Sequence, residues 1–123
     1  MKACIDSDVL IDYFDGEPEA AEEFGRYESV LISRISWMEV LIGVDDSESR
    51  EIREEFLRLF RVVELDEVVA REAIGLRKKH RLKLPDAIVW ASARLNDAIL
   101  VTRNSKDFRA SDPSIRIPYR LRS

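Results

Sequence analysis

The sequence has very little of what redox, zinc and histidine-dependent active sites require. Its 123 residues include one cysteine and one histidine, which excludes an internal disulfide and disfavours a zinc site. Cys4 has apolar neighbours, so we expect it to pack as a small apolar side chain. His80 stands alone in a basic segment, which disfavours two-histidine ribonuclease chemistry and serine triads. Any hydrolysis by this chain would therefore need a metal ion.

Glycine and proline are also scarce, with four of each, while 46% of the residues are hydrophobic. This composition excludes collagen-like and disordered classes, and we expect residues 1–123 to form one globular domain. The few glycines form no Walker or Rossmann phosphate loop. The longest weakly charged stretch, residues 30–44, is too short to cross a bilayer. With no apolar signal segment after Met1, we expect a cytoplasmic protein without a membrane anchor.

Charge is distributed unevenly along the chain. The net charge is −4, but residues 1–72 carry 8 basic and 20 acidic side chains, whereas residues 73–123 carry 12 basic and 4 acidic ones. The basic C-terminal part indicates contact with a polyanion or an acidic partner, although a charged, solvated surface explains it equally well.

Short apolar runs alternate with segments of helical period. The runs occupy residues 3–5, 29–33, 61–65 and 98–102, and a fifth short strand is indicated within 114–119. Helices are predicted over residues 8–14, 18–27, 35–43, 48–60, 67–80 and 85–96, with Gly43 as a helix stop. This order predicts an α/β fold in which a parallel β-sheet of four to five strands is flanked by helices.

Acids and hydroxyls follow two of the predicted strands. Asp-Ser-Asp at residues 6–8 comes after the first strand, and Thr-Arg-Asn at residues 102–104 comes after the fourth. Ligand sites in open α/β sheets form beyond the carboxyl ends of the strands. We therefore expect both segments to border one site.

Two further carboxylates occupy unusual helix positions. Ile35 and Ile42 lie one turn on either side of Glu39, which places its carboxylate on the apolar stripe unless the helix is rotated to expose it. Asp86 follows Pro85 in the first turn of the last predicted helix, where an acid also complements the helix dipole. A carboxylate on a core-facing stripe needs a cation, a shifted pKa or a water-filled cleft.

Asp6, Glu39 and Asp86 are therefore candidates for one oxygen-rich site. Such a site suits a hard divalent cation, Mg²⁺ or Mn²⁺, which keeps several waters and needs only a few carboxylates.

Four motifs occur in order along the chain: IDSDVLID at 5–12, ISWMEVLIG at 35–43, LPDAIVWASA at 84–93 and LVTRNSKDF at 100–108. Together they resemble the PIN-domain ribonucleases, specifically the VapC toxin type of toxin–antitoxin pairs. The resemblance covers nearly the whole chain and implies a PIN-like fold. It implies that Asp6, Glu39 and Asp86 bind the metal and act in catalysis.

The resemblance also implies supporting roles for Ser7, where the family often has threonine, and for Thr102. A fourth acid is common two residues after that threonine. Here Asn104 occupies the position and Asp107 follows three residues later, so either residue could complete the site. We expect Asp8 to be a helix-start acid close to the water of the site, and Asp12 to be a solvated helix residue.

The implied reaction is hydrolysis of an RNA phosphodiester by a metal-activated water, which leaves 5′-phosphate and 3′-hydroxyl ends. The implied partners are a second copy of the chain and a VapB-like antitoxin, with a segment in the acidic cleft or a groove beside it. Arg103 is the first candidate to contact RNA because it adjoins the site. Further candidates are Arg77, Lys78, Lys79, Arg81, Lys83 and Lys106.

Three other interpretations remain open at this point. In a haloacid dehalogenase-like phosphatase, Asp6 would be the nucleophile and Asp8 the acid/base, but a suitable lysine and late acidic pair are missing. A receiver-type signalling domain would use Asp66 after the third strand but lacks its lysine after the fifth. A PIN-like domain that binds RNA or a partner, with catalysis weakened by Asn104, is the third.

Overall fold

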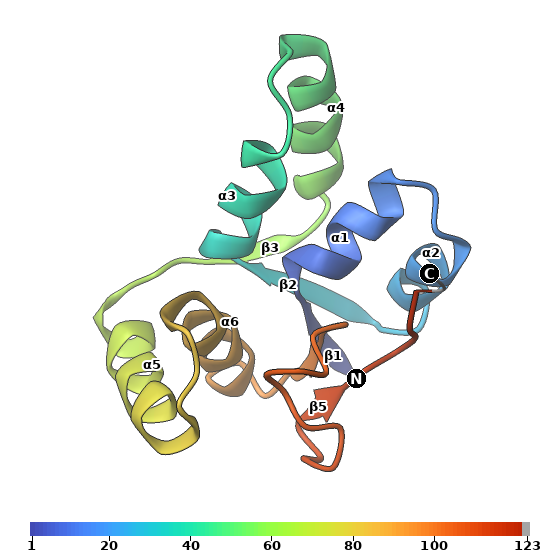
Figure 1. The fold of residues 1–123 in the computed structure, drawn as a ribbon. Coiled ribbons are helices and arrows are strands. Elements are labelled where there is room, and N and C mark those ends of the chain that lie inside the picture. Colours follow the sequence, from blue (N-terminus) through green and yellow to red (C-terminus); the bar gives the residue numbers. More distant parts are fainter. Residues whose placement is uncertain (122–123) are drawn as a thin grey trace.

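The computed structural model describes residues 1–121. Strands and helices alternate along most of the chain, and the helices lie on both sides of a central sheet (Figure 1). The elements are β1 Lys2–Ile5, α1 Ser7–Phe14, α2 Pro18–Phe24, β2 Ser29–Ser33, α3 Arg34–Ile42, α4 Ser47–Leu57, β3 Arg61–Val63, α5 Glu67–His80, α6 Leu84–Arg94, β4 Ile99–Val101 and β5 Ile115–Arg116.

The five strands form one parallel sheet in the order β3-β2-β1-β4-β5. The chain winds outward from β1 to β2 and β3 on one side, and later returns to place β4 and β5 on the other. The strand order therefore reverses between β1 and β4. In open parallel sheets such a reversal leaves a crevice at the carboxyl ends of the two strands, which is where ligands bind.

Strand alternation divides the core into two layers. Cys4, Leu31 and Leu100 face the cluster formed with α5 and α6. Their neighbours, such as Ile5 and Val101, face the cluster formed with α1, α3 and α4. Successive side chains of a strand point to opposite faces, so a sheet covered on both sides needs apolar residues at every position. The expected packing of Cys4 is confirmed, since it is fully buried, and burial raises the pKa of its thiol to about 12.

Aromatic rings join α1, α2 and α4 on one side of the sheet. Tyr13 stacks on Phe56 with ring centroids 4.4 Å apart, and Phe14 and Phe24 meet Phe56 edge to face. Such contacts contribute beyond the area they bury. They hold the C-terminal end of α1 against α2 and α4.

The predicted fold class and element order are confirmed, with differences at some ends. Helix α2 ends at Phe24 because Gly25 caps it, three residues before the predicted end, and α4 ends at Leu57 in a tight turn through Phe60. Strand β3 pairs only as far as Val63, opposite the last residue of β2. Within residues 1–121, no helix is both long and apolar enough to cross a membrane.

Candidate active site

A cleft of about 390 Å³ opens at the carboxyl ends of β1 and β4, where the strand order reverses. It receives side chains from the starts of α1 and α6, from α3 and from the loop after β4. The residues that line it are Asp6, Ser7, Asp8, Glu39, Asp86, Arg103, Asn104, Ser105 and Lys106. The predicted residues Asp6, Glu39 and Asp86 thus share one cleft although they are far apart in the sequence.

Asp6 is the most buried acid of the cleft, with 6% of its surface exposed. It caps the start of α1, where Oδ1 accepts a hydrogen bond from the backbone N–H of Ser7 at 2.8 Å. Its Oδ2 accepts a hydrogen bond from the hydroxyl of Thr102 at 2.8 Å. Burial, followed by repulsion from Asp8, raises the pKa of Asp6 to about 7 despite these bonds. Thr102 is fully buried, so it orients Asp6 from behind the cleft.

Asp8 lies in the first turn of α1 and is half-buried at the cleft. Its carboxylate accepts a hydrogen bond from the backbone N–H of Arg103 at 3.1 Å. Burial raises the pKa of Asp8, while the Arg103 N–H opposes that rise. The position in the first turn is the one expected for a helix-start acid beside the site.

Glu39 reaches the cleft by a different route from the one its sequence position predicts. The apolar-stripe argument is wrong, because Ile42 is 76% exposed and α3 buries Ser36 and Val40 instead. Glu39 is exposed, as in the alternative of a rotated helix. Its Oε1 accepts a hydrogen bond from the Ser7 hydroxyl at 3.1 Å, which connects α3 to the start of α1.

Asp86 lies in the first turn of α6 and is half-buried. Burial raises its pKa to about 6, and repulsion from Asp107, Glu39 and Asp8 adds to the rise, whereas Lys83 opposes it. A cation placed in the cleft would offset this repulsion and lower the pKa of Asp86 again.

These donors fit a divalent cation that keeps part of its water shell. Within the part of the chain that the structure describes, no three acidic, histidine or cysteine side chains already form a compact metal-binding group. Mg²⁺ is normally held by one or two carboxylates plus water and phosphate oxygens, so an open acidic cleft satisfies it where a closed cage is absent. Asp6, Glu39 and Asp86 would supply the carboxylate oxygens.

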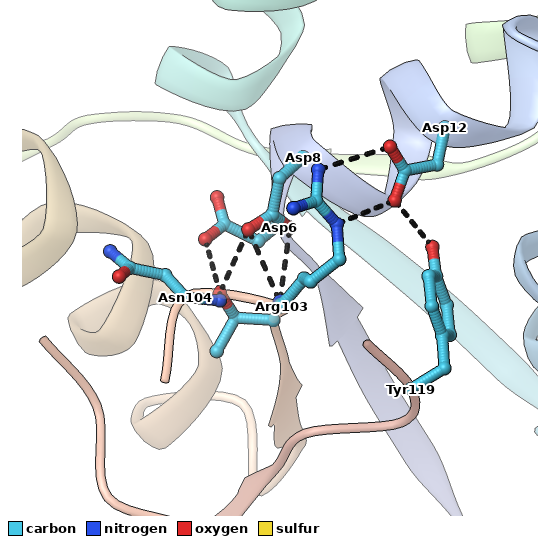
Figure 2. A network of polar contacts seen from close by, with 7 residues as sticks. Asp6, Asp8, Asp12, Arg103, Asn104 and Tyr119 are labelled. Atoms are coloured by element: carbon cyan, nitrogen blue, oxygen red, sulfur yellow. Dashed lines mark hydrogen bonds and ion pairs between the residues drawn. The ribbon is translucent and has the colours of Figure 1, made fainter. Parts of the chain in front are cut away.

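Arg103 does not project freely from the site (Figure 2). Its Nε donates to Oδ2 of Asp12 at 2.7 Å, and a second nitrogen donates to Oδ1 at 3.1 Å. The Tyr119 hydroxyl donates to the same carboxylate at 2.7 Å. The expectation that Asp12 is solvated is wrong, since only 4% of its surface is exposed. Its place within the apolar run of α1, between Ile11 and Tyr13, was the signal for its burial.

Asn104 and Asp107 form a pair after β4. The Asn104 amide nitrogen donates to Oδ2 of Asp107 at 2.9 Å, and its oxygen accepts from the Asp107 backbone N–H at 3.2 Å. Both ends of the Asn104 amide are therefore engaged. Asn104 lines the cleft, while Asp107 lies behind it and contributes the largest charge repulsion on Asp86.

The other basic candidates lie in three places. Lys106 lines the cleft itself. Lys83 directly precedes α6 near Asp86, and Arg77 and Lys79 are exposed on the last turn of α5. Lys106 is therefore the lysine that lines the cleft, while Lys83 lies close enough to Asp86 to oppose the rise in its pKa.

The parallel α/β sheet, with an acidic cleft where its strand order reverses, defines a class of αβα proteins whose ligand site is built from acids. The chain belongs to the PIN domain family, whose model matches residues 3–112. The resemblance drawn from the four sequence motifs is thus confirmed.

Among solved structures, the chain is similar to a toxin–antitoxin complex from Klebsiella pneumoniae, with 36% identity, a TM-score of 0.90, and coverage of 97% of this chain and 99% of that one. FitAcB from Neisseria gonorrhoeae has 21% identity, a TM-score of 0.78, and coverage of 98% and 100%. DNA-bound VapBC from Salmonella typhimurium has 23% identity, a TM-score of 0.76, and coverage of 94% and 96%. No match was found among curated proteins.

The receiver and phosphatase interpretations do not fit these findings. Receiver domains have the strand order 2-1-3-4-5, whereas this sheet runs β3-β2-β1-β4-β5. Membership of the PIN family over residues 3–112 likewise replaces the assignment of Asp6 as a phosphatase nucleophile.

Proposed function

We propose that this protein is a Mg²⁺- or Mn²⁺-dependent endoribonuclease that acts as the toxin of a toxin–antitoxin pair. The observation that carries the proposal is that Asp6, Glu39 and Asp86, from three separate segments, line one cleft at the reversal of strand order. Membership of the PIN family and the likeness to a Klebsiella pneumoniae toxin–antitoxin complex support it.

The chain's own residues provide the scaffold for this reaction. Asp6, Glu39 and Asp86 would hold the cation, with Asn104 or Asp107 as a fourth position, and Thr102 and Ser7 fix the orientation of Asp6 and Glu39 through their hydroxyls. When bound, the cation lowers the pKa of a water and offsets charge on the phosphate. Lys106 lines the same cleft, so its ammonium can hold a phosphate oxygen of the substrate.

Asp8 contributes in a different way. Its carboxylate is held by the backbone N–H of Arg103 and borders the cleft, so it can bind water there without leaving its position. It is a candidate to accept the proton that the attacking water loses, which would leave a 5′-phosphate and a 3′-hydroxyl on the RNA.

A large groove at the opposite end of α1 from the cleft is the candidate seat for the antitoxin. It has a volume of about 980 Å³ and lies between the end of α1, α2 and α4. Phe14, Phe56, Ile52 and Leu59 give it an apolar surface, and Ile52 and Leu59 are 60% and 74% exposed. Its acidic rim is formed by Glu17, Glu48, Glu51 and Glu55.

An apolar groove with an acidic rim fits an amphipathic helix whose apolar face is flanked by lysine or arginine. We assign this seat to a basic helical segment of a VapB-like antitoxin. A second copy of the chain is a separate proposed partner, and exposed apolar residues such as Val68 and Ile74 on α5 offer surface for it. Light scattering at several concentrations measures whether the purified chain is a dimer.

The proposed activity is tested by incubating purified protein with a mixed RNA pool and Mg²⁺ or Mn²⁺, with EDTA as the metal-free condition. We expect cleavage with metal and none with EDTA. Asp6→Asn and Glu39→Gln should abolish cleavage, whereas Glu19→Gln, an exposed acid on α2 outside the cleft, should not. Intact RNA under every condition, from folded protein, would overturn the ribonuclease proposal.

One observation favours a second candidate function, a PIN-like domain that binds RNA or a partner and cleaves weakly. The amide that replaces the family's common fourth acid is hydrogen-bonded to Asp107 at both ends, so it adds no negative charge to the cleft and its oxygen is shared with the Asp107 backbone N–H. RNA binding without cleavage in the same assay would support this alternative.

A further inference from the structure

A second cavity, of about 480 Å³, lies next to the proposed active site. It is enclosed by the end of α5, one side of α6 and the segment between β4 and β5. Its lining residues are Lys79, His80, Arg81, Trp90, Asp107, Phe108, Arg109, Ser111, Asp112 and Ile115. None of the side chains assigned above to the metal ion, except the alternative fourth position Asp107, belongs to it.

Positive charge dominates the wall of this cavity. Lys79, Arg81 and Arg109 are exposed, and within residues 1–121 none of them forms an ion pair. The two acids of the lining accept hydrogen bonds from neutral groups, Asp112 from Ser114 and Asp107 from Asn104, and neither forms an ion pair with the three cations. The cations thus remain available to an anionic ligand.

The cavity also presents an aromatic surface. The imidazole of His80 contacts the indole of Trp90 with ring centroids 4.7 Å apart and the two ring planes tilted by 52°. His80 is exposed, whereas Trp90 is only 3% exposed. The Trp90 indole N–H donates to the Ser114 hydroxyl at 3.3 Å, which fixes the ring from behind. His80 is therefore a supported flat surface of the kind on which a nucleic-acid base stacks.

Arg81 is held in an unusual backbone conformation at the rim. It ends α5 with φ 55° and ψ 41°, the left-handed region that favours glycine or asparagine over arginine. Its exposed guanidinium lies at the rim of the cavity.

The cavity adjoins the acidic cleft through one pair of residues. Asp107 lines the cavity, and it is hydrogen-bonded to Asn104, which lines the cleft. The cleft and the cavity are therefore contiguous, as they would have to be if one RNA strand occupied both.

We infer that this cavity is a subsite for an RNA nucleotide flanking the scissile phosphate, with the base against His80 and a phosphate held by Arg81, Arg109 and Lys79. The inference rests on the proposed ribonuclease function, and it adds where the substrate is held beside the metal cleft. Aromatic stacking combined with cations that follow the backbone is the general way in which proteins hold single strands.

The test compares two double variants of equal charge. Arg81→Asn/Arg109→Gln removes two cavity cations, and asparagine tolerates the left-handed conformation at position 81. Arg50→Gln/Arg61→Gln removes two exposed cations from α4 and β3, outside the cavity. Binding of a short fluorescein-labelled RNA is measured by anisotropy with Mg²⁺ in the Glu39→Gln background, and cleavage is measured with Glu39 intact.

We expect the cavity variant to bind RNA about tenfold more weakly, with a smaller dependence of binding on salt, because charged contacts to phosphate are lost. The KM for cleavage should rise by a similar factor, and the control variant should match the parent. Equal binding and cleavage by the two double variants would overturn the subsite while leaving the ribonuclease proposal intact. Absence of cleavage by the parent would overturn the ribonuclease, and the binding comparison would still decide whether the cavity holds RNA.

Stacking is tested separately at His80. His80→Phe keeps a flat ring against Trp90 and should bind RNA as the parent does, whereas His80→Ala should weaken binding about tenfold, as expected when one stacked base is lost. If His80→Ala binds as tightly as the parent, the base does not lie on this ring and the proposed subsite is wrong in that respect.

Discussion

Asp12 of α1 holds the guanidinium of Arg103 through two hydrogen bonds, of 2.7 and 3.1 Å, across 91 residues of sequence. The Asp12 carboxylate is buried, and it also accepts a hydrogen bond from the hydroxyl of Tyr119 in the C-terminal segment. Arg103 thus joins three parts of the chain at the wall of the cleft. Its main-chain N–H holds Asp8, so its position matters to the site even though its side chain is committed to Asp12.

Asp12→Asn should therefore lower both stability and activity. Removing the Asp12 charge leaves the Arg103 guanidinium without its counter-charge. We expect the free energy of unfolding in urea to fall by about 2 kcal/mol. This is less than the full cost for a buried ion pair because Arg103 is partly exposed. RNA cleavage should fall because the Arg103 loop no longer holds Asp8. Tyr119→Phe is the matched control: it removes one hydrogen bond to Asp12 and should cost about 1 kcal/mol. Equal stability of Asp12→Asn and the parent would contradict this role.

The acidic cleft predicts an unusual pH dependence for the metal-free protein. The pKa of Asp6 is about 7 in the folded state and about 4 in an unfolded chain. Between these values the folded state binds more protons, so the free energy of unfolding should fall as pH rises through this window. Asp86, with a pKa of about 6, acts in the same direction.

Urea denaturation in EDTA should thus show greater stability at about pH 5 than at about pH 8, and Asp6→Asn should reduce the difference. Mg²⁺ should stabilise the protein most at the higher pH, where the carboxylates are charged and repel one another. Below about pH 4 the free energy of unfolding should instead fall as pH falls, because Glu23 becomes protonated. Burial raises the pKa of Glu23, but the hydrogen bonds from Arg116 and Tyr27 outweigh it and hold that pKa below its usual range. A parent protein whose stability rises steadily from pH 5 to pH 8 without metal would contradict the assignment of a raised pKa to Asp6.

Exchanging acid and amide at positions 104 and 107 tests which residue is the fourth ligand of the proposed metal site. Asn104→Asp adds a carboxylate that lines the cleft, and we expect it to bind Mn²⁺ more tightly in calorimetry, at the cost of its bond to Asp107. Asp107→Asn removes the largest charge repulsion on Asp86. If Asp107 is a ligand, this variant binds Mn²⁺ more weakly. If it only repels, affinity changes little and the pKa of Asp86 falls towards its ordinary value.

The sequence predicts the strands, the helices and the placement of Asp6 and Asp86 at helix starts because those features depend on local pattern. The alternation of short apolar runs with helical segments, the helix stop at Gly43 and the first-turn position of Asp86 can all be recognised from neighbouring residues. Glu39 shows the limit of this reasoning: its predicted stripe is wrong, since Ile42 faces solvent, and its place in the cleft depends on how α3 packs. The pairing of Asp12 with Arg103 was missed for the same reason, because it joins residues that only the closed sheet brings together.

The groove between α1, α2 and α4 offers a direct test of partner chemistry. A synthetic helical peptide with leucines on one face and lysines on its flanks should bind, whereas the same peptide with glutamates should not, because the rim is acidic. Ile52→Lys should weaken binding of the basic peptide about tenfold, since it removes exposed apolar surface and adds repulsion. Ile74→Lys on α5, a similarly exposed isoleucine, is the control and should bind as the parent does. If the basic and acidic peptides bind equally, charge does not select the partner and the groove cannot be the seat of a basic antitoxin helix.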